Sequence, residues 1–200
     1  MDKRHFLGAA AAAAALPALA ATKPADCAAP GGPTLLTVTG AIARSNRGPF
    51  DPVVDKMMHK QKLRFDKAFT FDFAALANMP AHAIRPTLEY DGKAHALRGP
   101  LLADVLAAAG VQAPQAHQQL KLLLRAVDGY AAALTLAEAR TRRYIVATHL
   151  DGKPMALGGL GPLWALYDAD RVPEMAARPL AERFGACPWA LYHIDVSRPD

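Results

Sequence analysis

The chain has 200 residues, of which 52% are apolar, so it can bury one sizeable core and is too short for two domains of ordinary size. A formal net charge of +5 at pH 7 suits anionic ligands or membrane surfaces, whereas no recognition motif supports nucleic acid. We therefore expect a small anionic ligand or substrate as the partner, with a membrane redox partner as a further candidate and no nucleic acid.

The N-terminus has the layout of an export signal. Lys3 and Arg4 precede an alanine-rich apolar run and the small-residue site Ala18-Leu19-Ala20, which predicts a signal peptide over residues 1–20 that is cleaved near Ala20. The run is too short and too weakly hydrophobic for a stable membrane span. The Lys-Arg pair also resembles the twin-arginine export motif with lysine in first place, so twin-arginine export and ordinary secretion both remain open. Either route predicts a periplasmic protein.

A linker rich in Pro, Gly and Ala, residues 21–33, separates this signal from the domain predicted over residues 34–200. The chain has two cysteines, Cys27 and Cys187. In an oxidising compartment they could form a disulfide, and two unpaired thiols are the alternative. No Cys-x-x-Cys, Cys-x-x-Cys-His or His-x-x-x-His spacing occurs, so zinc and c-type haem have no support.

Short elements alternate in the first half of the domain. Thr34–Thr39 reads as a strand, and Phe71–Asn78 reads as a short helix. The basic segment Arg44–Lys67 between them reads as a solvated face, with a patch that faces an anion as the alternative. Residues 87–97 predict a hairpin, because the Asp-Gly pair in their middle suits a tight primed turn. The apolar residues of 101–109 repeat with a helical period and follow a proline, which predicts a helix.

The second half of the domain is predicted to supply most of the sheet. Leu120–Ala126 alternates apolar with charged residues, as a strand with one buried face does. Thr135 and Glu138 match a capping box that starts a short helix, and residues 170–187 read as irregular. The remaining predicted strands are Arg143–His149, Leu163–Tyr167 and Trp189–Val196. Because strands and helices mix without a βαβ rhythm, we predict an α+β fold with mixed or antiparallel sheets and short helices.

Several segments, in the expected order, resemble the sulfite-oxidase-type molybdopterin-binding domain. The turn Ala126–Tyr130, with its Asp-Gly-Tyr, and the segment Tyr144–Met155 carry most of the resemblance. The other segments are Thr37–Gly40, Phe71-Asp72, Arg98–Leu106, Gly161–Leu163 and Trp189–Val196. The resemblance covers about residues 34–198. It implies that fold, a molybdenum cofactor held by a pterin dithiolene, and an oxidoreductase that acts on a small oxyanion or sulfoxide-like substrate.

Three positions depart from the family pattern. The metal-ligating cysteine of the family falls around Arg85–Tyr90, which contains no cysteine, although a soft thiolate is what such a metal prefers. The arginine of the family's Gly-Pro-x-Arg is Trp164 here, and Pro188 stands where a lysine often precedes the closing tryptophan. The chain is most similar to a compact, exported, single-domain branch that also lacks the cysteine. The alternative to an oxidoreductase is therefore a cofactor-free module that binds a ligand or a partner and retains the fold.

The candidate site follows from the resemblance and from residue chemistry. Tyr130 matches the tyrosine beside the metal and is the catalytic candidate, and the alternative is a strand-end tyrosine that packs its ring. Asp128 is a candidate for binding the cofactor, although its side chain can also stabilise the turn. The other candidates for binding the cofactor are Arg85, Thr87, Arg98, Gly159 and Gly161. Arginines can clamp an anion, and glycines let backbone N–H groups approach a phosphate.

Overall fold

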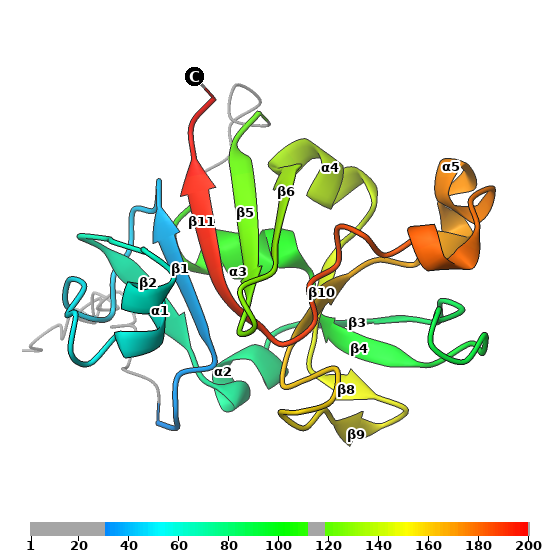
Figure 1. The fold of residues 1–200 in the computed structure, drawn as a ribbon, viewed down its shortest axis with the longest axis horizontal. Helices are drawn as coiled ribbons and strands as arrows, with labels where there is room; N and C mark the ends of the chain where they lie inside the picture. The colour runs from blue at the N-terminus through cyan, green and yellow to red at the C-terminus, as the bar shows by residue number, and fades with distance from the viewer. Residues whose placement is uncertain (1–30, 112–118, 200) are drawn as a thin grey trace, which may run out of the picture.

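The computed structural model describes residues 31–111 and 119–199 of the chain (Figure 1). The predicted signal peptide, most of the predicted linker and Cys27 lie outside the described residues. In the described part of the chain, no helix is long and apolar enough to cross a membrane.

Five strands form the central sheet, in the order β2-β1-β11-β5-β6 (Figure 1). β1 pairs in parallel with β11, whereas the other neighbours pair antiparallel, so the sheet is mixed. The strands are β1 (Leu36–Gly40), β2 (Ala68–Phe71), β5 (Lys121–Ala126), β6 (Ala131–Thr135) and β11 (Leu191–Ser197). The buried face predicted for β5 is present, since Leu122 and Leu124 are 0% exposed.

Two smaller sheets and several short helices complete the fold. One sheet has the order β3-β4-β8-β9, and the other pairs β10 with β7. Their strands are β3 (Ala81–Ile84), β4 (Leu97–Pro100), β7 (Ile145–Ala147), β8 (His149–Leu150), β9 (Lys153–Pro154) and β10 (Trp164–Leu166). The α-helices are α1 (Lys56–Lys60), α2 (Phe73–Ala77), α3 (Leu102–Ala108), α4 (Leu136–Thr141) and α5 (Pro173–Ala176). The predicted α+β class, with mixed and antiparallel sheets and short helices, is confirmed.

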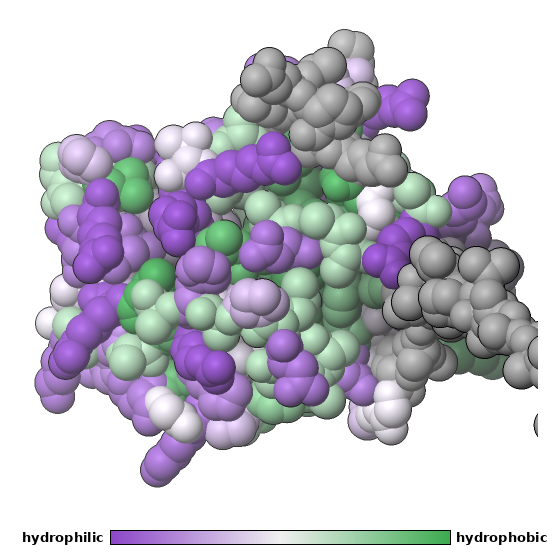
Figure 2. All heavy atoms as spheres, turned by 180° about the vertical axis from the view of Figure 1, so that it is seen from behind, coloured by the Kyte–Doolittle hydropathy of each residue, from purple (hydrophilic) through white to green (hydrophobic). Residues whose placement is uncertain are grey.

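The helix α3 lies behind the central sheet in Figure 1 and buries Leu102, Val105 and Leu106 against it. The surface on that side has a broad hydrophobic area in its middle, bordered by hydrophilic residues (Figure 2). None of the large hydrophobic residues exposed in the described chain belongs to α3, which presents alanines such as Ala107 to solvent. The exposed large side chains gather elsewhere, around two cavities.

Two predicted helix starts can be compared with the structure. The capping box at α4 is confirmed, because Thr135 Oγ1 accepts the N–H of Glu138 and the Glu138 carboxylate accepts the N–H of Thr135. The α2 helix begins at Phe73, two residues later than predicted, since Asp72 is its N-cap and accepts the Ala75 N–H at 2.7 Å.

The prediction of a hairpin over residues 87–97 is wrong, because the two strands lie on either side of residues 85–96 and not within them. Residues 85–96 instead form the connection between β3 and β4, and a single bridge, Thr87 to Ala94, closes around the Asp-Gly turn. We call residues 85–96 the connecting loop. The partner strand β3 was missed because its residues are exposed or half-buried and show no hydrophobic alternation.

Three further elements differ from the predictions. The segment Arg44–Lys67 contains the short helix α1, and the strand β2 follows it where no strand was predicted. Residues 170–187, predicted as irregular, contain α5 and the end of a 3₁₀ turn, with a second 3₁₀ turn at Leu180–Glu182. Such short elements lack the length over which a periodic pattern can be recognised.

Candidate functional site

A cavity of about 250 Å³ opens where three segments meet: the connecting loop, the β5–β6 turn, and residues 181–189 before β11. We call it the aromatic cavity. Its lining includes two carboxylates and several aromatic rings. Among the lining residues are Glu89, Tyr90, Asp128, Tyr130, Cys187 and Trp189.

The β5–β6 turn places Asp128 and Tyr130 at the cavity. Gly129 adopts a φ of 94°, which permits the tight turn, and Asp128 Oδ1 accepts the N–H of Tyr130 at 2.8 Å. The hydroxyl of Tyr130 donates to the carbonyl of Gly185. The structure therefore brings the candidates Asp128 and Tyr130 together in one wall of the cavity.

Trp164, the residue that stands where the resemblance expects an arginine, is completely buried beneath this cavity. Its ring centroid lies 6.3 Å from that of Tyr90 and 6.2 Å from that of Phe184, two residues of the lining. Its indole N–H donates to the carbonyl of Cys187 at 2.9 Å. Trp164 therefore packs behind two lining residues and fixes the backbone of the third wall. We call Phe184, with Trp164 packed behind it, the floor of the aromatic cavity.

Cys187 lies in the lining but is only 4% exposed. Burial raises the pKa of its thiol to about 12, so the sulfur stays protonated at neutral pH. Its Sγ lies 3.9 Å from the hydroxyl of Tyr144, another buried residue. Cys187 is a free thiol in the described chain, and its pairing with Cys27 stays a prediction.

The cavity is acidic although the chain as a whole is basic. Among its described lining residues, Glu89 and Asp128 are charged and none is Lys, Arg or His. The nearby Arg183 points its donors elsewhere, to Asp170 at 2.8 Å and to the carbonyls of Ala176 and Arg178. Burial and the Glu89 carboxylate together raise the pKa of Tyr90 to about 12, so its hydroxyl also stays protonated.

The other predicted site residues lie outside this cavity. Arg85 and Thr87 anchor the connecting loop through their backbone N–H groups, which donate to Asp168 and Asp170 at 3.4 and 2.7 Å. Arg98 is exposed on β4 and pairs in register with His149 of β8, whose ring packs on α2.

The two predicted glycines also lie apart from the aromatic cavity. A Cβ at Gly161 would come within 2.4 Å of the Met155 side chain, so close packing already requires glycine there. Gly159 is exposed, and a Cβ there would meet the carbonyl oxygen of Ala156 at 3.7 Å, an ordinary contact. The structure thus unites two of the seven predicted site residues in one cavity.

Three lining residues were missed as site candidates: Glu89, Tyr90 and Trp189. Each is partly exposed, and an exposed aromatic residue was the signal that could have found two of them. Tyr90 and Trp189 are 99 positions apart in the sequence, so no local pattern joins them.

A second and larger cavity, of about 320 Å³, lies beside α1. We call it the apolar cavity. Its aliphatic lining includes Val54, Met57 and Leu157, and its charged pair is Arg47 with Asp55, whose Nη2 and Oδ2 atoms are 2.7 Å apart.

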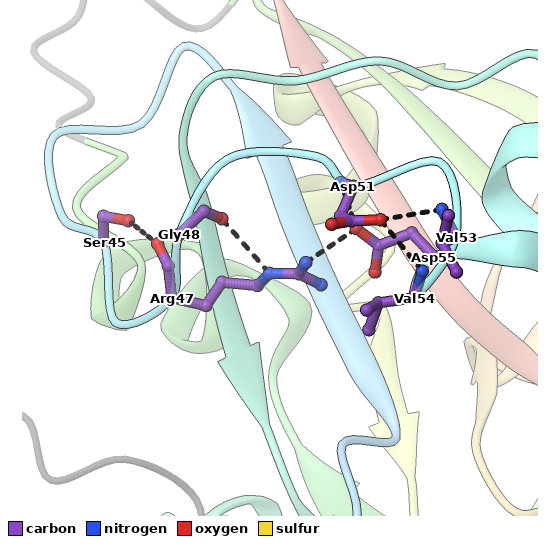
Figure 3. Close-up of polar contacts among 7 residues, drawn as sticks. All are labelled: Ser45, Arg47, Gly48, Asp51, Val53, Val54 and Asp55. Atoms are coloured by element: carbon purple, nitrogen blue, oxygen red, sulfur yellow. Dashed lines mark hydrogen bonds and ion pairs between the residues drawn. The ribbon is translucent and has the colours of Figure 1, made fainter.

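A small network holds the wall of the apolar cavity (Figure 3). Asp51 accepts the N–H groups of Val53 and Val54 at 2.7 and 3.0 Å, while Asp55 accepts the N–H of Asp51 at 2.9 Å. The hydrogen bonds from the Val54 and Val53 N–H groups lower the pKa of Asp51. The charges of Arg47, Asp51 and Asp55 are therefore satisfied by neighbouring groups, and Lys56 also lines the cavity.

Among the described residues, no group of three or more His, Cys, Asp or Glu side chains is placed to hold a metal ion.

Comparison with known proteins gives a likeness of fold. No protein-family model matches the chain, and no curated protein matches it in sequence. Among solved structures, 27 chains match, one being the sulfane dehydrogenase SoxCD from Paracoccus pantotrophus. That match has 10% identity and a TM-score of 0.52, and it covers 81% of this chain and 37% of the other. The chain thus spans little more than a third of that neighbour's length.

Proposed function

We propose that this chain is an exported ligand-binding module that retains the sulfite-oxidase-type fold and uses the aromatic cavity as its binding site. Support for the fold comes from the ordered segments of the sequence and from the likeness to a sulfane dehydrogenase. Support for binding comes from a preformed cavity in which an apolar floor meets a few polar groups, as in ligand sites generally.

The observation that carries the proposal is the position of Trp164. The resemblance places an arginine there to meet the anionic groups of a molybdenum cofactor, whereas the indole of Trp164 is buried and bonded to the Cys187 carbonyl. A buried indole presents no positive charge to the cavity, and Trp164 is not among the described lining residues.

The other residues of the cavity do not fit a molybdenum cofactor either. The connecting loop has no cysteine, and the thiol of Cys187 is protonated because burial raises its pKa to about 12. Two carboxylates, Glu89 and Asp128, would face the anionic pterin without a cationic partner among the described lining residues. We therefore derive no step through that cofactor.

A second candidate function is a molybdopterin-dependent oxidoreductase that acts on a small oxyanion or sulfoxide-like substrate. The observation in its favour is the fold likeness to a sulfane dehydrogenase, together with Tyr130 at the cavity wall. This candidate would need a substitute for the missing thiolate and for the missing arginine.

The experiment that separates the two candidates is molybdenum analysis with pterin fluorescence. The protein is purified under native conditions from the periplasm of a molybdenum-replete bacterial host. The binding-module proposal predicts neither molybdenum nor pterin above the level of a mock purification from the same host without the protein. About one metal and one pterin per chain would overturn it and establish the oxidoreductase candidate.

A further inference from the structure

We propose that the aromatic cavity binds a small organic cation with a substituted or quaternary ammonium head group. This inference rests on the proposed function, because it names the ligand class of the same cavity. It departs from the anionic ligand that the basic composition of the chain suggests.

The first observation is where the exposed aromatic side chains lie. Seven large hydrophobic residues are exposed in the described chain, and the three aromatic ones, Tyr90, Tyr130 and Trp189, all line this cavity. They are 54%, 47% and 38% exposed. The faces of such rings carry negative electrostatic potential and attract ammonium groups within about 6 Å. Exposed aromatic rings that gather around one hollow mark a binding site.

The second observation is the charge of the walls. Glu89 and Asp128 face the cavity from two different segments, the connecting loop and the β5–β6 turn. Neither carboxylate has an ion-pair partner among the described residues. A cation that enters the cavity would supply this missing partner, whereas an anion would be repelled by both.

The third observation is the character of the floor. The lining includes the buried ring of Phe184, with Trp164 packed behind it, and the uncharged thiol of Cys187. A bare ammonium group needs hydrogen-bond acceptors on every side, which such a floor does not provide. Methyl groups on the nitrogen can instead pack against the rings, so a substituted ammonium fits better than a primary one.

The cavity is also held in shape before any ligand arrives. The Tyr130 hydroxyl bonds the carbonyl of Gly185, and Trp189 forms a strand-like bridge with Trp164. Preorganised walls lower the entropy lost on binding. A volume of about 250 Å³ is below the range of roughly 300–1,000 Å³ usual for drug-sized ligands, so the ligand is small.

The test is a calorimetric titration of the processed protein with choline and with 3,3-dimethylbutan-1-ol. The second molecule has the same shape, but a carbon atom replaces the charged nitrogen. We expect choline to bind at least about tenfold more tightly, because only the cation gains from the rings and the carboxylates.

Three variants locate the binding. Trp189→Leu should weaken choline binding roughly 3- to 30-fold, whereas Trp189→Phe keeps an aromatic face and should restore most of it. Glu89→Gln keeps the size of the side chain and should weaken binding several-fold, with a loss that shrinks in high salt. The affinity of the neutral isostere should change little in Glu89→Gln.

The inference would be overturned if the two probes bound with equal affinity. It would also be overturned if Trp189→Leu and Glu89→Gln left choline binding unchanged. No binding of choline or tetramethylammonium to protein free of molybdenum and pterin would also overturn it, while the binding-module proposal would stand. Molybdenum and pterin in the native protein would instead overturn the proposed function.

A free cation and the choline head group of a lipid present the same chemistry. A parallel sedimentation assay with phosphatidylcholine vesicles separates them. Vesicle binding that Glu89→Gln weakens assigns a lipid source, and choline binding without vesicle binding assigns a free molecule.

Discussion

The two cavities of this protein divide its exposed hydrophobic residues by chemical type. The three exposed aromatic residues line the aromatic cavity, whereas the four exposed aliphatic ones lie in or beside the apolar cavity. Those four are Val53, Val54, Met57 and Leu157.

The charges differ in the same way. In the apolar cavity Arg47 and Asp55 neutralise each other at 2.7 Å, and in the aromatic cavity two carboxylates have no cationic partner among the described residues. The comparison teaches that cavity size does not identify the site. The apolar cavity is the larger of the two, but its exposed side chains are aliphatic, and Lys56 is the one charge among its described lining residues outside the Arg47–Asp55 pair. The aromatic cavity can select its ligand by charge.

The largest expected effect comes from removing the floor of the aromatic cavity. Trp164→Ala should lower the free energy of unfolding by about 3–5 kcal/mol, because it empties a fully buried site and leaves the Cys187 carbonyl without its donor. Urea denaturation measures the loss. The matched control is Leu157→Ala in the apolar cavity, which is 69% exposed and should change stability by less than about 0.5 kcal/mol. A loss below about 1 kcal/mol for Trp164→Ala would contradict the account of the floor.

The strand β11 connects the two cavities, since Trp189 precedes it and Tyr192 lies in it. It also carries the buried His193, which should make the free energy of unfolding depend on pH. Burial, with a smaller contribution from Arg125, lowers the pKa of His193 to about 4, so the ring is neutral in the folded protein. The unfolded chain takes up this proton first, so the stabilisation is complete above about pH 6.5 and is lost as the pH falls towards 4.

Between about pH 6.5 and 4, the free energy of unfolding of the native chain should fall by about 3 kcal/mol through this group. Unfolding measured from pH 7 to 4 should therefore show a steeper decline for the native chain than for His193→Gln, which has no such proton to bind. Identical pH dependence of the two proteins would rule out the mechanism.

The ion pair of the apolar cavity should contribute less to the free energy of unfolding than the floor of the aromatic cavity does. Arg47→Met leaves Asp55, whose side chain is 8% exposed, without its partner and should cost about 1–3 kcal/mol. The double replacement Arg47→Met/Asp55→Leu should recover most of that loss, since neither charge remains. Chemical denaturation of the three proteins measures it, and a double variant less stable than Arg47→Met would contradict the prediction. Choline affinity should stay unchanged in both, because the pair lies in the other cavity.

The smallest effect is expected at the far end of the connecting loop. There His95 lies between Asp91 and Asp151, with nitrogen–oxygen distances of 3.0 and 2.6 Å. Hydrogen bonds to Asp151 and then to Asp91 raise the pKa of His95 above 6.5, and the bond to His95 lowers the pKa of each carboxyl below 3.8.

The stabilisation by His95 is complete below its unfolded pKa of 6.5 and is lost as the pH rises through the raised folded value. The carboxylates contribute above 3.8 and lose their contribution as the pH falls through their lowered values. The difference in melting temperature between the native chain and His95→Gln should thus be largest near pH 5.5 and fall by pH 9. A difference that grows at high pH would show that the ring is not protonated in this bridge.

Sequence reasoning identified the parts of the molecule whose structure is decided locally. The alternation of Leu122 and Leu124 fixes which face of β5 is buried, and the capping box fixes the start of α4. The strand β3 was invisible, because a short exposed strand is stabilised by pairing with β4 and not by its own pattern.

The candidate site shows the same difference between residues placed by local sequence and residues placed by the tertiary fold. Asp128 and Tyr130 were both named as candidates because they belong to the one turn that carries the family resemblance, and that turn keeps them close in space. Glu89 and Trp189 reach the same cavity from segments that only the tertiary fold brings together. Trp164 was recognised as a departure from the family pattern, but its place beneath Tyr90 depends on packing that no local pattern shows.

The most direct test of the central claim is native mass spectrometry of the processed protein from a molybdenum-replete periplasm. The claim is that this cavity binds a small organic cation and not a molybdenum cofactor. We predict the mass of the bare chain, together with a species heavier by one small cation when choline is added in excess. A species heavier by a molybdenum-bearing pterin before any addition would contradict the account.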